Sequence, residues 1–275
     1  MEGWLDAPPS GRHGQIGVLL RQWRTMRGVS QLALSLEAGI SMRHLSYVET
    51  GRSHPSRDMV LRLAEALDVP LRERNTLFLS AGYAPRYRET GLDNPELAEA
   101  RQAVELMLAH HEPFPAIVLD RHWNLLMANA ATGRFMALFP ECAVPGPPNA
   151  LRLVFHPRGL RRFIANWDEV AGSMINEVHR ELAADPSDTA AKALLAELVE
   201  YPGVPGRWRT VDLERPPSPL LVATYQHGAQ ELRFFTTITT FGTPQHVTTQ
   251  ELRIECFFPA DDATRATMSA SALPP

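Results

Sequence analysis

The side chains best suited to bind another molecule gather between Ser30 and Arg57. Arginine can donate two parallel hydrogen bonds to the edge of a guanine base, and short polar side chains can contact phosphate oxygens. Arg43 is therefore the candidate for reading a base, whereas Gln31 and Ser41 stand at predicted helix starts, which favour phosphate. The candidate DNA-contacting residues are Ser30, Gln31, Ser41, Met42, Arg43, His44, Ser46, Tyr47, Arg52 and Arg57.

Two short helices joined by a tight turn are needed to hold these side chains. Ser30 predicts the start of the first helix, Ala38-Gly39-Ile40 predicts the turn, and Ser41 predicts the start of the second helix. Because Leu45 and Val48 face inward, some of the other side chains between Ser41 and Val48 must face outward. The pattern predicts a helix-turn-helix, whose second helix enters the major groove of double-stranded DNA. The alternative is a small helical domain with a solvated basic face.

Residues 28–56 carry this pattern in the sequence GVSQLALSLEAGISMRHLSYVETGRSHPS. The segment resembles the DNA-binding domain of Xre/Cro-type bacterial repressors, in which the Ser-Gln pair, the small-Gly turn and the second serine recur at this spacing. Further helices predicted over 15–27, 56–67 and 70–81 complete an all-α head of five helices.

The chain has 275 residues, of which 44% are hydrophobic, enough for two domains with their own cores. Its net charge of −4 combines about +3 through Gly91 with about −7 beyond it, which suits a DNA-binding head joined to a separate domain. The predicted organisation is a flexible arm at 1–14, the head at 15–82, a linker at 83–95, a sensor domain at 96–260 and a C-terminal tail at 261–275.

Several classes of protein are disfavoured by what the sequence lacks. It has no apolar run of about eighteen residues and no secretion signal, so we expect no membrane partner. With Cys142 and Cys256 as the only cysteines, we expect neither a disulfide framework nor a metal site, and we assign the protein to the reducing cytoplasm. No catalytic motif is present, so we expect no enzymatic activity and no required cofactor.

The second domain mixes strand-like and helical patterns. Together they predict an α+β fold in which a five-stranded antiparallel sheet carries its flanking helices on one side, in the order of a PAS-like domain. The predicted helices cover 96–110, a piece ending at Phe139, 151–181 with a break at 156–159, and a stretch ending at Tyr201. The predicted strands are 113–120, 124–131, 219–226, 231–242 and 246–258.

This half resembles the MmyB-like transcription regulators, whose C-terminal PAS-like domain binds a small ligand. The resemblance implies a transcription regulator with a fatty acid as its effector. It also implies the bacterial context in which such regulators act. The matching residues are Pro115, Ala116, Val118, Leu119, Asp120, Trp123, Asn129, Asn149, Arg152, Phe155, Pro157, Trp167 and Trp208.

An excess of apolar residues in the predicted sheet and helices suggests a cavity for a small apolar or amphipathic molecule. The predicted ligand-binding residues are Val118, Leu126, Asn129, Phe155, Arg162, Phe163, Trp167, Met174, Ile175, Val178, Phe234, Thr236 and Ile238. A carboxylate head would need a donor, for which the candidates are Arg162, Arg158, His179, Asn129 and Tyr225. We expect a homodimer that binds a palindromic site. The alternative is a second domain that serves only dimerisation or protein interaction and holds no ligand.

Overall fold

The structure is a computed structural model that describes residues 13–211 and 220–271. The chain divides into two compact units. The head unit comprises the described residues up to Thr90 together with 243–250, and the sheet unit comprises 91–242 and the residues from Glu251 onward. The boundary at Thr90 falls within the predicted linker, but the contribution of 243–250 to the head was not predicted.

Five helices build most of the head unit, as the sequence predicts. Serine caps begin three of them, because the Ser30, Ser41 and Ser56 hydroxyls accept hydrogen bonds from backbone amides three residues later. Gly17 brings the first helix against the third, since a Cβ there would lie 2.4 Å from the Val48 carbonyl oxygen. The helices are α1 (His13–Met26), α2 (Gln31–Glu37), α3 (Met42–Glu49), α4 (Arg57–Ala66) and α5 (Leu71–Ser80). The predicted arm at 1–14 lies outside the described residues, except that α1 begins at His13.

A segment from late in the chain completes the head core. The short helix α11 (Val247–Glu251) replaces the start of a strand predicted over 246–258. Val247 is fully buried in the same hydrophobic cluster as the head helices, and its amide donates to the Arg88 carbonyl at 3.0 Å. The Gln250 side chain accepts a 2.7 Å hydrogen bond from the amide of Leu71. Tertiary burial therefore overrides the strand preference of the β-branched residues here.

The sheet unit contains a five-stranded sheet in the order β2-β1-β5-β4-β3, and all neighbouring strands are antiparallel. This confirms the predicted five-stranded antiparallel sheet and the α+β class. The β3–β4 hairpin turns at Gly228 and Ala229, with Gly228 at a positive φ of 61°. The strands are β1 (Ala116–Leu119), β2 (Leu125–Ala128), β3 (Val222–His227), β4 (Gln230–Thr239) and β5 (Arg253–Pro259).

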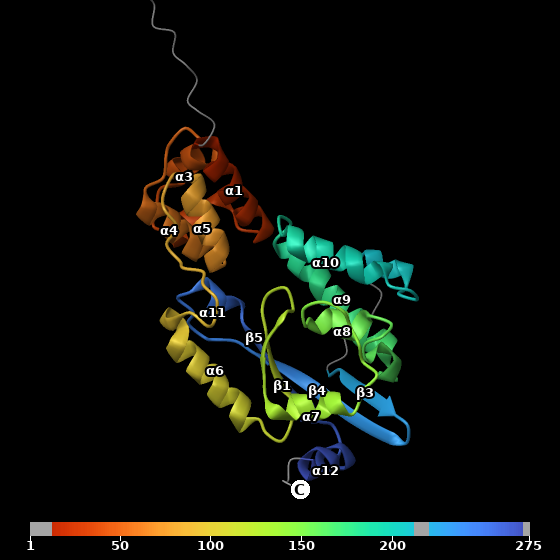
Figure 1. The fold of residues 1–275 in the computed structure, drawn as a ribbon. Helices are drawn as coiled ribbons and strands as arrows, with labels where there is room; N and C mark the ends of the chain where they lie inside the picture. The colour runs from red at the N-terminus through yellow and green to blue at the C-terminus, as the bar shows by residue number, and fades with distance from the viewer. Residues whose placement is uncertain (1–12, 212–219, 272–275) are drawn as a thin grey trace, which may run out of the picture. The chain divides into compact units, whose positions relative to one another are not determined.

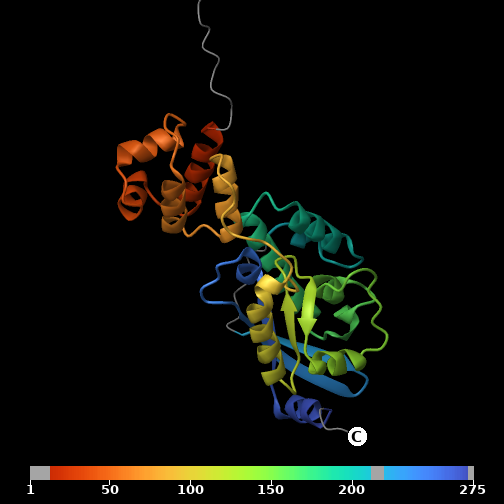
Figure 2. The ribbon, with the colours of Figure 1, turned by 60° about the vertical axis from the view of Figure 1, so that its left-hand side comes forward.

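Helices cover both faces of this sheet, so the prediction of helices on one side was wrong. On the outer face, α6 (Ala98–His110) packs Val104 and Leu108 against Val118 and Ile254. Figures 1 and 2 show α6 along one face of the strands and the other helices along the opposite face. The helices of that inner side are α7 (Ala130–Ala137), α8 (Ala150–Phe155), α9 (Trp167–Ala184) and α10 (Thr189–Glu200), with 3-10 turns at Leu160–Phe163 and Gly206–Arg209.

The predicted C-terminal tail is instead a packed helix, α12 (Asp262–Ala270). Asp261 caps it by accepting a 2.8 Å hydrogen bond from the Thr264 amide. Met268 is buried in the core of the sheet unit, and the Thr264 hydroxyl accepts from the Arg233 amide of β4. The helix therefore belongs to the fold of the sheet unit.

Candidate functional site

The outer side of α3 carries several of the predicted DNA-contacting residues. Ser41, Met42 and Arg43 are exposed, while Leu45 and Val48 are fully buried as predicted. Arg43 donates from Nε to the Tyr47 hydroxyl at 3.0 Å, and its guanidinium carbon lies 5.4 Å from the centre of the Tyr47 ring. The Tyr47 ring and hydroxyl thus hold the Arg43 guanidinium through its Nε and its flat face.

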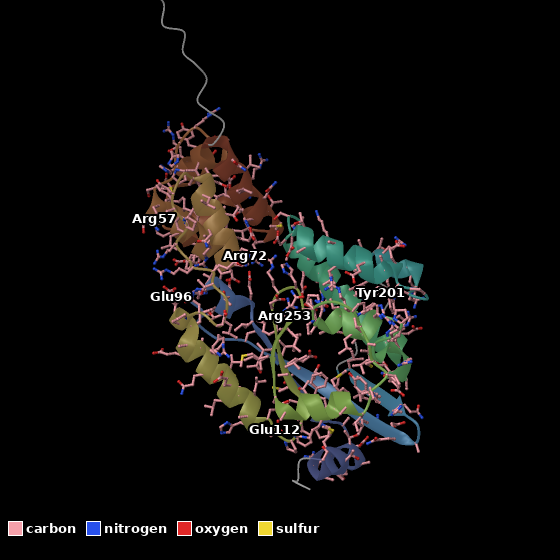
Figure 3. The ribbon with its side chains drawn as sticks, in the orientation of Figure 1. Arg57, Arg72, Glu96, Glu112, Tyr201 and Arg253 are labelled. Atoms are coloured by element: carbon pink, nitrogen blue, oxygen red, sulfur yellow. The ribbon has the colours of Figure 1, made fainter. Side chains whose placement is uncertain are left out.

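The other predicted contact residues differ in their placement. Arg52 and Arg57 are exposed, and Arg57, labelled in Figure 3, lies 5.6 Å above the Phe78 ring. Ser46 is half-buried. The Ser30 and Ser41 hydroxyls are used as helix caps. The His44 ring turns inward, so that its Nε2 is buried without a hydrogen-bond partner among the described residues.

Gln31 belongs to a buried ionic cluster that joins α1, α2 and α3. Glu49, whose side chain is only 2% exposed, accepts hydrogen bonds from Arg24 at 2.7 and 3.0 Å and from the Gln31 amide at 2.7 Å. Burial alone would raise the pKa of Glu49, but the hydrogen bonds from Arg24 and Gln31 outweigh it and hold that pKa below its ordinary value. The side-chain amide of Gln31 is therefore occupied by its hydrogen bond to Glu49 of α3.

A cavity of about 500 Å³ lies in the sheet unit, a size typical of ligand-binding sites. Its floor is the inner face of the sheet, and its other walls come from α7, α8, α9 and the loop at 144–149. Among the predicted ligand-binding residues, the cavity is lined by Met174, Phe234, Thr236 and Ile238, and of the predicted head-group donors by Tyr225.

Nine of the predicted ligand-binding residues lie elsewhere. Val118 points to the opposite face of the sheet, and Leu126 is 42% exposed where the β1–β2 register shifts. The side chain of Asn129 bonds to the backbone. Its oxygen accepts from the Thr132 amide at 3.1 Å, and its nitrogen donates to the Phe114 carbonyl at 2.8 Å. Five others lie in the core of the sheet unit and do not line the cavity: Phe155, Phe163, Trp167, Ile175 and Val178.

The predicted arginine donors also lie outside the cavity lining. Arg162 is exposed, donates to the Glu141 carbonyl at 2.8 Å and stacks 4.8 Å from the centre of the Phe163 ring. Arg158 is exposed, and His179 bonds the Trp208 carbonyl at 2.9 Å. No arginine, lysine or histidine appears among the described residues that line the cavity.

Glu255 lines the cavity but is not among the residues predicted to bind the ligand. It faces inward from β5, where its neighbours Ile254 and Cys256 face the outer cluster. The alternation of RIECF contains this signal, but using it requires the strand register, which the sequence did not supply. Burial raises the pKa of Glu255 above its ordinary value.

Two further features bear on function. Across the described ranges, no three or more histidine, cysteine, aspartate or glutamate side chains gather in a way that could hold a metal ion. A membrane-spanning helix is likewise not found among the residues that the structure describes.

Known proteins resemble both units. Residues 100–270 match the family model of the MmyB-like transcription regulator ligand binding domain, and residues 20–74 match a helix-turn-helix model. An uncharacterized HTH-type transcriptional regulator of Mycobacterium tuberculosis is 31% identical over 116 residues, which are 42% of this chain and 75% of the relative.

Two solved structures resemble about a quarter of the chain. The restriction-modification controller protein C.AhdI from Aeromonas hydrophila is 35% identical, covering 22% of this chain and 94% of its own, with a TM-score of 0.22. The clp gene regulator ClgR from C. glutamicum is 24% identical, covering 26% of this chain and 88% of its own, with a TM-score of 0.23.

Proposed function

The chain belongs to the MmyB-like transcription regulators, and we propose that it reads a specific DNA sequence with α3 and binds a small apolar or amphipathic effector in the sheet unit. The observation that carries the proposal is the presence in one chain of an exposed Arg43–Tyr47 pair on α3 and of a large apolar cavity. Ligand binding and DNA binding, with no catalytic step, account for both features. The proposed place of action is the cytoplasm, where the DNA is.

A fatty acid is the effector that the family resemblance suggests, and the apolar walls suit its alkyl chain. Its carboxylate finds no cation among the lining residues, so we propose the broader class of apolar and amphipathic molecules. Solvent extraction of the purified full chain followed by mass spectrometry tests this. A stoichiometric small molecule supports the proposal, while repeated empty extracts favour a second unit that serves only dimerisation or protein interaction.

The proposed mechanism is a population shift. A ligand that binds one conformation of the sheet unit more tightly increases the population of that conformation, and DNA affinity changes if the two conformations present the head differently. The proposed active form is a homodimer that contacts two half-sites about one helical turn, or roughly 34–36 Å, apart.

Arg43→Ala is expected to cost about 1–3 kcal/mol of specific DNA binding and to relax discrimination at one base pair, because the arginine is placed to contact a base edge. Arg52→Ala is expected to weaken binding to all sequences alike, as loss of a phosphate contact does. Titration of the selected duplex and of single-base variants separates the two effects. Equal binding of wild type and both variants would contradict the assignment of α3.

Ala223→Phe is expected to reduce ligand occupancy at least about tenfold, because Ala223 lines the cavity from β3 and the added ring occupies its space. Thr237→Phe is the matched control, since Thr237 is exposed on β4 and does not line the cavity. Binding of the neutral dye Nile red measures occupancy of the cavity. Binding of the dye by Ala223→Phe as tightly as by the wild type would place the ligand elsewhere.

A further inference from the structure

The inner face of the sheet presents a carboxyl group to the cavity. Glu255 of β5 pairs in register with Ile117 on β1 and with Ile238 on β4, and all three side chains line the cavity. The Thr236 hydroxyl, which also lines the cavity, opposes the effect of burial by lowering the pKa of Glu255. Glu255 therefore lies between two isoleucines in a mainly apolar wall, where an ionised carboxylate without a partner is costly.

Positive groups lie outside the lining. On β5, Arg253, labelled in Figure 3, pairs with Glu181 at 2.6 Å and lies 4.9 Å from the centre of the Trp123 ring. Glu177, the second carboxylate in the lining, pairs with Arg180 and is 38% exposed. The remaining polar residues of the lining are uncharged: Thr132, Asn149, Ser173, Tyr225 and Thr236. Arg253 therefore offsets part of the Glu255 charge from outside the lining, but no cation within the lining can contact a second negative charge.

The charge of Glu255 affects the pKa of the neighbouring Tyr225. Burial, together with the nearby Glu255 charge, raises the pKa of Tyr225, so the tyrosine stays neutral and can act as a hydrogen-bonding group. A positive ligand group beside Glu255 would favour the ionised carboxylate and offset the cost of its burial.

Accepting the proposed function of the cavity as a ligand site, we infer that it selects apolar molecules carrying an amine, whose ammonium group pairs with the Glu255 carboxylate. Tyr225 and Thr236 supply the neighbouring hydroxyl groups, and the apolar walls hold the hydrocarbon part. A carboxylate of the same chain length is disfavoured because it would lie next to Glu255 with no cation in the lining.

The test compares three ligands of equal chain length, n-decylamine, 1-decanol and decanoate, each below its micelle concentration at pH 7. An alkylamine is protonated there, as a lysine side chain is. Nile red displacement from the full chain is expected to show that decylamine binds about ten- to hundredfold more tightly than decanoate, the range expected for a charged hydrogen bond. Glu255→Gln is expected to remove this preference, while decanol still binds and displaces Nile red.

Retained decanol binding shows that the cavity of the Glu255→Gln variant is intact. The matched control is Glu177→Gln, which alters the second lining carboxylate, 38% exposed and already paired with Arg180, and should keep the preference for the amine. A wild-type preference for decanoate, or an amine preference that survives Glu255→Gln, overturns the inferred selectivity while the cavity remains a ligand site. Failure of all three ligands to bind overturns the proposed function of the cavity together with the selectivity.

Discussion

Glu49→Ala is expected to destabilise the head unit by about 3–5 kcal/mol, because it leaves the Arg24 guanidinium buried without its carboxylate partner. Glu49 also accepts from Gln31, so the substitution breaks the link among α1, α2 and α3 at once. Hydrogen–deuterium exchange of peptides from these helices measures the loss within the head. Protection equal to that of the wild type would contradict the structural role assigned to the cluster.

Glu37→Ala is the control for this substitution. Glu37 is exposed at the end of α2, so its removal should change stability by no more than about 0.5 kcal/mol.

The same cluster predicts a pH dependence. Because the folded-state pKa of Glu49 is lowered, its contribution to stability is fully present above the unfolded glutamate pKa of about 4.3 and is lost as the pH falls through the lower folded value. In the Glu49→Ala variant, this part of the acid sensitivity of head exchange should disappear.

Val247→Asp is expected to destabilise the head by at least about 3 kcal/mol, although residue 247 is remote in sequence from every head helix α1 to α5. Val247 is fully buried in the head core, and an aspartate there would be a charge without a partner. Hydrogen–deuterium exchange of peptides from α4 and α5 measures the effect. Gln245→Asp, at an exposed position, is the control and should leave exchange unchanged.

Local signals explain why the helix-turn-helix was predicted well. Ser30 and Ser41 are caps whose effect is confined to one helical turn, and Gly39, with a φ of 62°, forms the turn between α2 and α3. The inward-facing Leu45 and Val48 follow from helical periodicity alone. Such features need no knowledge of distant parts of the chain.

The parts that were missed depend on distant partners. Val247, Thr248 and Thr249 of α11 prefer strands, and the burial of Val247 among the head helices favours a helix here instead. Glu255 enters the cavity because β5 pairs with β1 and β4 in a register that a single sequence does not reveal. In α12, by contrast, the cap at Asp261 was visible in the sequence and could have predicted the helix.

The late segment at 243–250 has a consequence for constructing hybrid regulators. A fragment ending at Thr90 would lack Val247 from its interior and the Gln250 group that accepts from Leu71. Grafting this reading head onto a foreign sensor therefore requires transplanting two separate stretches of polypeptide, and a chimera made by a single junction should inherit an incomplete head.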